Sequence, residues 1–191
     1  MQEFSWNDFY TITKKHPPWP RLIRAVELLK RSGEALDLGC GAGRDTRYLL
    51  ESGFRVTAVD QEAASLELLT DLPADRLHRV RSSFEDFHFG RYDLINAHFA
   101  LPFMEPRQFS LVFARLKTAL KPGAIFVGQF FGSNDSWNRP NSHMTFFTRQ
   151  EALEQVEGLE VLEFEEEDQD GTTANREPKH WHVYHIIARK L

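Results

Sequence analysis

The sequence is almost free of cysteine: Cys40 is the only one in 191 residues. A single cysteine excludes an intramolecular disulfide and argues against a metal site built from thiolates. We therefore expect a fold that depends on an ordinary hydrophobic core, with no resident metal ion. The chain is long enough to bury such a core, and its 41% hydrophobic and 27% charged residues are the shares of a globular domain.

Clusters of basic residues are also missing. The net charge at pH 7 is −5, and no run of five or more lysines and arginines occurs. Binding to a phosphate backbone requires clustered positive charge, so we expect no nucleic-acid partner. The acidic residues do gather at Glu163 and Glu165–Asp168, and a short acidic run of this kind indicates a solvated strand end or loop.

Long apolar runs are missing as well. The most apolar stretches, such as INAHFALPFM at 95–104, are too short and too interrupted to cross a bilayer. The first ten residues lack the basic start and apolar core of a secretory signal. We expect a cytoplasmic protein without a membrane partner. No repeat or linker divides the chain, so we predict a single domain over 1–191, in which 1–20 form an N-terminal lid segment.

A glycine-rich turn is the most informative feature that is present. In ALDLGCGAGRDT (35–46), glycines at alternate positions follow a short apolar strand, and Asp37 stands two residues before the first of them. The dinucleotide fingerprint G-x-G-x-x-G requires a third glycine where this chain has Arg44. A carboxylate at Asp37 would also repel a pyrophosphate. The turn therefore favours a nucleotide ligand that places a cationic group, not a phosphate, beside Asp37.

Strand and helix patterns alternate through roughly the first 155 residues, which predicts a parallel sheet. The last two strand patterns have no helix between them and should pair antiparallel. We predict an α/β fold with a doubly wound, mostly parallel seven-stranded sheet, an antiparallel last strand and helices on both faces. The predicted strands are 34–38, 54–60, 76–84 (polar, and so at an edge), 92–100, 124–132, 159–168 and 180–191.

The motif D-x-G-x-G-x-G resembles that of the class I S-adenosylmethionine-dependent methyltransferases. LDLGCGAGRDT matches their first motif, and Asp60, at the end of the second strand, matches their ribose-binding acid. The order of elements is also similar, so the resemblance covers nearly the whole chain. GRDT, INAHFALPF and HWHVYHIIARK look most like small bacterial enzymes of the tellurite-resistance type. The resemblance implies S-adenosylmethionine as the cofactor and a small-molecule methyl acceptor.

The cofactor's chemistry suits the residues at these positions. Its carboxylate should meet the helix N-terminus at Arg44–Thr46, and its ribose should meet Asp60. The family's adenine-binding acid is replaced here by Ser83, so the adenine edge should bind Ser83 and the backbone of Phe84. The cofactor-binding residues that we predict are Asp37, Gly39, Cys40, Gly41, Gly43, Arg44, Asp45, Asp60, Ser83, Phe84, Asn96 and Ala97.

The acceptor should lie beyond the carboxyl ends of the parallel strands. Loops at 98–104, 130–144 and 168–182 should hang over the cofactor there, and an N-terminal helix with Trp6, Phe9 and Tyr10 should act as a lid. The histidines in these loops have three readings: a general base, a metal site, which no recognised ligand spacing supports, or ordinary polar residues at a cleft mouth. The candidate catalytic residues are His98, His180 and His182, and Trp137 and Trp181 are candidate walls of the pocket.

The sequence favours methyl transfer by in-line displacement, in which the enzyme contributes mainly positioning. Since no convincing acid–base pair stands out, a soft nucleophile such as a thiol or a chalcogen oxyanion is the expected acceptor. Two alternatives remain. One is an NAD(P)-dependent oxidoreductase, against which Arg44 and the final strand pair argue, and the other is a non-catalytic module that binds S-adenosylmethionine. The identity of the acceptor and the oligomeric state are left open.

Overall fold

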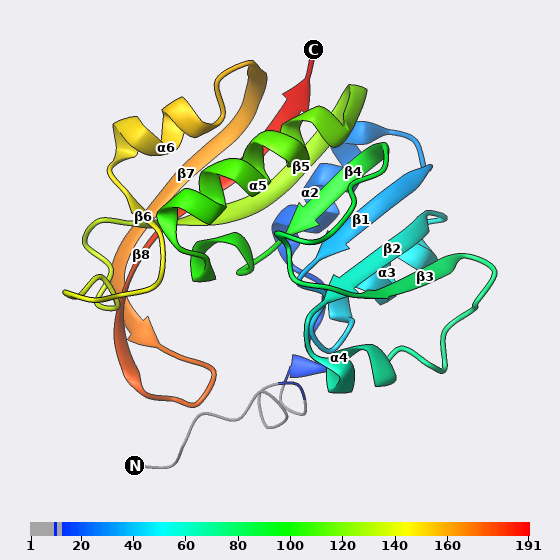
Figure 1. Cartoon of the computed structure of the whole chain (residues 1–191), viewed down its shortest axis with the longest axis horizontal. Helices are drawn as coiled ribbons and strands as arrows, with labels where there is room; N and C mark the ends of the chain where they lie inside the picture. The colour runs from blue at the N-terminus through cyan, green and yellow to red at the C-terminus, as the bar shows by residue number, and fades with distance from the viewer. Residues whose placement is uncertain (1–9, 11–12) are drawn as a thin grey trace.

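The computed structural model describes residue 10 and residues 13–191 as one mixed sheet with helices packed on its two faces (Figure 1). The sheet order is β3-β2-β1-β4-β5-β8-β7, and β6 pairs with β5 off this path. β8 runs antiparallel to both of its neighbours, β5 and β7, and the other pairs are parallel. The predicted fold class is confirmed, with β6 as a short additional strand. The strands are β1 Glu34–Leu38, β2 Arg55–Asp60, β3 Leu77–Arg81, β4 Tyr92–Ala97, β5 Leu120–Gly132, β6 Phe146–Phe147, β7 Leu159–Thr172 and β8 Pro178–Lys190.

The helices form two layers, one on each face of the sheet. α2 (Pro20–Leu29), α3 (Arg44–Glu51) and α4 (Ala63–Glu67) contribute to one apolar cluster, while α5 (Pro106–Ala119) and α6 (Arg149–Gln155) contribute to the other. A short 3₁₀ helix, η1 (Leu101–Phe103), follows β4. The predicted cap of α6 is present, because Thr148 and Glu151 form a capping box.

Phenylalanines dominate the core between α5 and the sheet. Phe109 and Phe113 of α5 meet Phe126 and Phe130 of β5 edge to face, with ring centroids 5.1–5.3 Å apart. All four side chains are essentially fully buried. Offset and edge-to-face aromatic pairs add to the free energy of burial, so this cluster fixes α5 on β5.

Two helix boundaries differ from those that the sequence predicts, which are a helix after HPPWP that stops at Gly33 and a helix over 61–72. α2 ends at Leu29, where Lys30 adopts the left-handed conformation (φ 57°), and not at Gly33. Gly33 serves a different purpose: a Cβ there would overlap the Asp93 carboxylate, which accepts a hydrogen bond from the Glu34 amide at 3.0 Å. The helix expected over 61–72 is also shorter, because only Ala63–Glu67 is helical and turns follow it.

The prediction of an irregular loop over 168–182 was wrong. β7 and β8 stay paired in register to Thr172 and Pro178, so only residues 173–177 connect them. Cross-strand contacts of polar side chains extend the ladder: His180 lies 2.7 Å from both Asp168 and Asp170, and the Trp181 indole donates to the Thr172 carbonyl at 3.2 Å. The predicted antiparallel pairing of the last two strands is confirmed, but the sequence pattern did not reveal how far alternating acids and histidines extend it.

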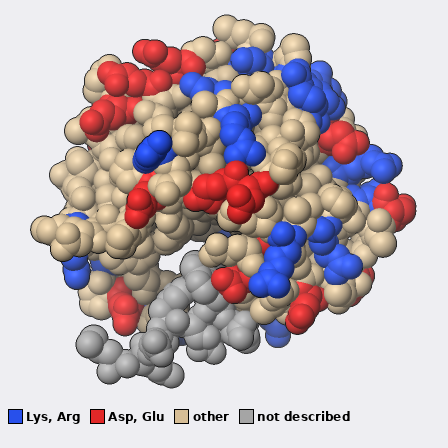
Figure 2. Space-filling view, viewed as in Figure 1, with Lys and Arg blue, Asp and Glu red and all other residues tan. Residues whose placement is uncertain are grey.

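The surface carries both charges. On the face drawn in Figure 2, lysines and arginines are interspersed with aspartates and glutamates. Within the part of the chain that the structure describes, no helix has the length and apolarity needed to cross a membrane. Trp6 and Phe9 of the expected lid lie outside the described residues.

Candidate functional site

The glycine loop joins β1 to α3 at the carboxyl edge of the sheet. Gly39, Gly41 and Gly43 have φ values of 76°, 51° and 77°, a region that side chains with a Cβ rarely adopt. The amides of Gly39 and Cys40 donate to the Val59 carbonyl at 2.8 and 3.0 Å, which ties the loop to the end of β2. A Cβ on Gly39 would also overlap that of Ala100, so the segment after β4 lies directly over the loop.

Gly43 is required for packing as well as for its backbone conformation. It is the residue that precedes α3, and a Cβ there would overlap the Leu69 side chain. Leu69 is fully buried in the cluster beneath α3. The third glycine of the motif therefore sets how closely α3 and the segment after α4 approach each other.

Asp60 is held in one orientation at the end of β2. One carboxylate oxygen accepts from the Gly41 amide at 2.9 Å and the other from the Glu62 amide at 3.0 Å. The Ser65 hydroxyl fixes the other side of the loop by donating to the Gly41 carbonyl at 2.6 Å. The carboxylate predicted to bind ribose is thus pre-oriented beside the glycine loop.

Two buried carboxylates lie next to this loop, on Asp37 and Asp45. The amide nitrogen of Asn96 bridges them, donating to Asp37 at 2.8 Å and to Asp45 at 3.1 Å. Asp37 also accepts from the Thr46 hydroxyl at 2.5 Å. Burial, followed by repulsion from Asp45, raises the pKa of Asp37 to about 7, and burial raises the pKa of Asp45. A nearby cation would stabilise the charged form of carboxyl groups whose pKa is raised in this way.

His98 extends this arrangement, because it contacts the side-chain oxygen of Asn96. Its Nδ1 lies against the Asn96 carbonyl oxygen and 3.8 Å from Asp45, and its ring stacks on Trp19 with centroids 5.7 Å apart. Burial, followed by the positive charge of Arg44, lowers the pKa of His98 well below its usual value. The imidazole is therefore neutral at pH 7.

Trp19 and Tyr10 cover the loop from the N-terminal side. The Trp19 amide donates to Asp45 at 3.2 Å, and the Arg44 guanidinium lies 4.4 Å from the centre of the indole. The Tyr10 ring is the nearest group to the position of a Cβ on Gly41, at 3.6 Å, and it is buried. Burial and the Asp60 charge raise the pKa of Tyr10. These are the two described aromatic residues of the expected lid segment that contact the site.

Of the two residues expected near the adenine, Phe84 lies against the glycine loop and Ser83 bonds to its own neighbours. The Phe84 ring comes within 3.3 Å of a Cβ placed on Gly39. The Ser83 hydroxyl is engaged locally, accepting from the Asp86 amide at 3.1 Å and donating to the Asp86 carboxylate at 2.9 Å. Cys40 is buried, its sulfur lies 3.7 Å from the Ser65 hydroxyl, and burial holds the pKa of its thiol well above the usual value. It is therefore a packing residue and not a reactive thiol.

Aromatic rings from four segments form a continuous wall beside His98. We call this set the aromatic wall; it links neighbouring rings with centroids 5.1–6.4 Å apart. Phe99 bends the chain here with a positive φ of 46°, and its amide donates to the buried Gln129 side chain at 2.8 Å. The members are Trp19, Phe99, Phe103, Phe131, Trp137 and Trp181.

A buried ion pair closes the far end of the aromatic wall. The Lys179 ammonium is bonded to Asp135 and lies 4.1 Å from the ring centres of both Trp137 and Trp181. A cation between two indoles is attracted to their faces. The pair anchors the start of β8 to the loop after β5, and no spacing in the sequence links these two residues.

The other two candidate catalytic histidines, His180 and His182, differ from His98 because both of their ring nitrogens have partners. Both ring nitrogens of His180 face carboxylates. His182 accepts from the Asn134 amide at 3.0 Å through Nδ1, and its Nε2 lies 3.0 Å from Glu166. Because the ring nitrogens of both residues are engaged with other protein groups, neither is available to take a proton from an acceptor. Within 10 and 13–191, no group of three or more histidine, cysteine or acidic side chains is arranged to hold a metal ion.

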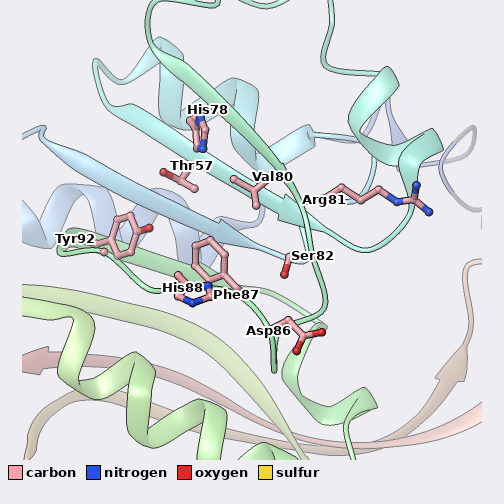
Figure 3. A pocket seen from close by; sticks show the side chains of 10 residues that line it. Thr57, His78, Val80, Arg81, Ser82, Asp86, Phe87, His88 and Tyr92 are labelled. Atoms are coloured by element: carbon pink, nitrogen blue, oxygen red, sulfur yellow. The ribbon is translucent and has the colours of Figure 1, made fainter.

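A cavity of about 360 Å³ lies elsewhere, beside the outer strand β3 (Figure 3). Thr57 and Val80 come from β2 and β3, while Phe87 and Tyr92 close it from the other side. None of the predicted cofactor residues lines it. The predicted residues meet instead at the carboxyl ends of β1, β2 and β4, where Figure 2 shows a hollow between that edge and the β7–β8 hairpin.

Comparison with known proteins places this site in a family. The model of the family described as tellurite resistance protein TehB matches residues 2–176. The crystal structure of TehB from Haemophilus influenzae is similar to this chain, with a TM-score of 0.78 and 21% identity. The match covers 98% of this chain and 68% of the Haemophilus influenzae protein. A Burkholderia thailandensis 1,6-didemethyltoxoflavin-N1-methyltransferase, solved with that compound and S-adenosylhomocysteine, is similar over 100% of this chain and 92% of its own, with a TM-score of 0.69 and 20% identity.

The curated relatives are longer proteins. An uncharacterized methyltransferase of Synechocystis is 34% identical over 96 residues, which is 49% of this chain and 45% of the relative. The chain spans less than half the length of the curated relatives it matches. The fold is the predicted one and is shared with solved S-adenosylmethionine-dependent methyltransferases, two of them with S-adenosylhomocysteine bound. The residues present fit S-adenosylmethionine: buried acids suit its ammonium, and an oriented carboxylate suits its ribose hydroxyls.

Proposed function

We propose, since the chain belongs to the family of the tellurite resistance protein TehB, that it transfers the methyl group of S-adenosylmethionine to a small-molecule acceptor. The acceptor in this proposal is a soft nucleophile, either a thiol or a chalcogen oxyanion. The observation that carries the proposal is the buried pair Asp37 and Asp45 beside a glycine loop that ends at an oriented Asp60. That combination suits a nucleoside attached to an amino acid and disfavours a pyrophosphate.

Each part of the cofactor has a proposed seat among the described residues. Asp37 and Asp45 supply the negative charge for its ammonium group, and Asp60 accepts from the ribose hydroxyls. Phe84, which lies across Gly39, packs on the adenine. The glycines leave the backbone open to close approach, since a Cβ on Gly41 would meet nothing nearer than the Tyr10 ring at 3.6 Å.

The acceptor lies, in this proposal, between His98 and the aromatic wall. Polarisable rings suit a soft, weakly hydrated atom such as sulfur or selenium, which makes favourable contacts with ring edges. The name of the family points in the same direction, towards tellurium. When bound, S-adenosylmethionine supplies a methyl group on a sulfonium, and the pair of electrons in the methyl–sulfur bond remains on sulfur as the methyl group leaves. The protein's part is to hold the acceptor in line with that bond.

Release of S-adenosylhomocysteine across a panel of acceptors tests the proposal. The panel contains small thiols, selenite, tellurite, phenols and amines, each incubated with the cofactor and the purified chain. We expect turnover with the soft acceptors that is abolished or strongly reduced by Asp60→Asn. Tight binding of S-adenosylhomocysteine without turnover of any acceptor would favour the non-catalytic binding module, and turnover of amines or phenols alone would overturn the choice of acceptor.

A further inference from the structure

The Nε2 atom of His98 stands out among the buried polar atoms. It is fully buried, and among the described residues it has no hydrogen-bond partner. Leaving a buried polar group unpaired is costly, and such groups are rare in native structures. His98 lies between the carboxylate pair and the aromatic wall. The missing hydrogen bond at Nε2 is explained if a bound ligand supplies its partner during the reaction.

The protonation pattern of His98 follows from its neighbours. Asn96 must turn its amide nitrogen toward Asp37 and Asp45, because the opposite orientation would set its oxygen against two carboxylates. Its oxygen therefore faces His98 Nδ1 and can only accept a hydrogen bond there. In a neutral imidazole the hydrogen is then on Nδ1, and Nε2 carries a lone pair.

We propose that His98 Nε2 removes the proton of the methyl acceptor, and that Asn96 and Asp45 are positioning residues that fix its tautomer and stabilise its protonated form. This inference rests on the proposed function and deepens it, because it selects an acceptor that carries a proton, such as a thiol or selenol. A bare lone pair attracts an S–H or Se–H donor and repels an oxyanion.

The step balances in atoms and charge. The electron pair of the acceptor's bond to hydrogen remains on sulfur or selenium and provides the new bond to the methyl carbon, while the proton passes to Nε2. The methyl–sulfur bond breaks and leaves its electron pair on sulfur. The single positive charge is on the sulfonium before the step and on the imidazolium after it. Asp45, 3.8 Å from Nδ1, then faces a full positive charge and stabilises it.

The charges around His98 keep it ready for this role. Burial and the positive charge of Arg44 lower the pKa of His98, so its Nε2 is free to take a proton, and Asp45 is the acid that lies nearest to the imidazolium formed. The titratable and charged groups that face it are Arg44 and Asp45 on α3, Asp37 on β1 through Asn96, Arg21 on α2 and His185 on β8.

The tautomer is tested without any substrate. Long-range nitrogen–proton NMR of the unliganded protein distinguishes a protonated Nδ1 from a protonated Nε2. We expect His98 to be the Nδ1–H form from pH 6 to 8, and Asp45→Asn to lower its pKa further. An Nε2–H tautomer, or a charged ring at pH 7, would overturn the inference whatever the activity of the enzyme.

The proton transfer is tested by His98→Gln and Asn96→Ala. With a thiol acceptor at pH 7 we expect His98→Gln to lower kcat by about 100-fold and to change the affinity for S-adenosylhomocysteine by less than threefold. The loss should shrink as rising pH ionises the thiol, because a thiolate needs no base. Asn96→Ala should show the same pH-dependent loss. The control is His78→Gln, an exposed histidine on β3, which should leave kcat unchanged.

The two proposals fail in different ways. Equal rates for wild type and His98→Gln at every pH would overturn the role of His98 and leave methyl transfer intact. Binding of S-adenosylhomocysteine without turnover of any acceptor would overturn the proposed function, while the tautomer measured by NMR would still decide whether Asn96 orients His98. A rate on tellurite that exceeds the rate on thiols would contradict the choice of a protonated acceptor.

Discussion

Asp37 illustrates how one residue connects the sequence to the chemistry. In the sequence it was only an acid two residues before a glycine turn. In the fold it shares the Asn96 amide with Asp45 in a fully buried setting, and burial raises its pKa to about 7. A carboxyl that holds a proton near neutral pH couples ligand binding to proton release.

The first prediction concerns pH and cofactor binding. Because an ammonium pairs with the carboxylate and not with the acid, the affinity for S-adenosylhomocysteine should tighten as pH rises from 6 to 8, by at most tenfold per pH unit. Calorimetric titration in buffers of different ionisation enthalpy measures both the affinity and the released proton. Asp37→Asn should bind more weakly and lose the pH dependence, whereas a wild-type affinity that is flat between pH 6 and 8 would refute the assignment.

The same pKa has a consequence for stability. The pKa of Asp37 is higher in the folded protein than in the unfolded chain, so the folded state binds the proton more tightly. The contribution of Asp37 to the free energy of unfolding is therefore most favourable at low pH and is lost as pH rises toward 7. Asp37→Asn should be stabilising relative to wild type at pH 8 and much less so at pH 5, which denaturant titration at both pH values measures.

A further prediction distinguishes backbone conformation from packing as the reason for glycine at position 43. Gly43→Ala combines a positive φ of 77° with an overlap against Leu69, whereas Gly158→Ala has a φ of 82° and nothing within 4 Å of its Cβ. Strain alone costs about 1–2 kcal/mol, and a forced shift in a packed core adds about 1–3 kcal/mol. Gly43→Ala should thus lose clearly more unfolding free energy in urea than its matched control, and equal losses would show that Leu69 yields without cost.

At the scale of elements, α5 shows which interactions hold the helix layer to the sheet. Phe113 is 1% exposed among Phe109, Phe126 and Phe130, while Leu111 on the same helix is 60% exposed. Phe113→Ala should lower the free energy of unfolding by about 3–5 kcal/mol, and Leu111→Ala by less than about 0.5 kcal/mol. Chemical denaturation of the two variants measures the difference, and similar losses would contradict the packing described for α5.

The β7–β8 hairpin shows where element-level prediction failed. Periodicity identified two strands, but it could not extend them through an acidic segment, because the stabilising partners are histidines on the other strand. The predicted end of α2 was wrong because Lys30 adopts a left-handed conformation that is usually taken by glycine. The helix predicted over 61–72 is shorter, since only Ala63–Glu67 is helical.

At the scale of the whole molecule, the sequence predicted the sheet, its single antiparallel strand and its two helix layers. Local patterns carry that information, since β-branched strands and glycine turns alternate along the chain. The neighbourhood of Asp37 and Asn96 also followed from topology, because these residues end adjacent parallel strands and lie in register. The Lys179–Asp135 pair and the stacking of Trp19 on His98 did not follow, because contacts between distant loops leave no periodic signal.

The central claim is that the glycine loop binds a sulfonium amino acid nucleoside, and calorimetric titration of the intact chain with S-adenosylhomocysteine and with NADH tests it most directly. We predict saturable binding of S-adenosylhomocysteine, weakened by about 1–3 kcal/mol in Asp60→Asn through loss of charged hydrogen bonds, and no binding of NADH. Binding of NADH with no heat from S-adenosylhomocysteine would contradict the account.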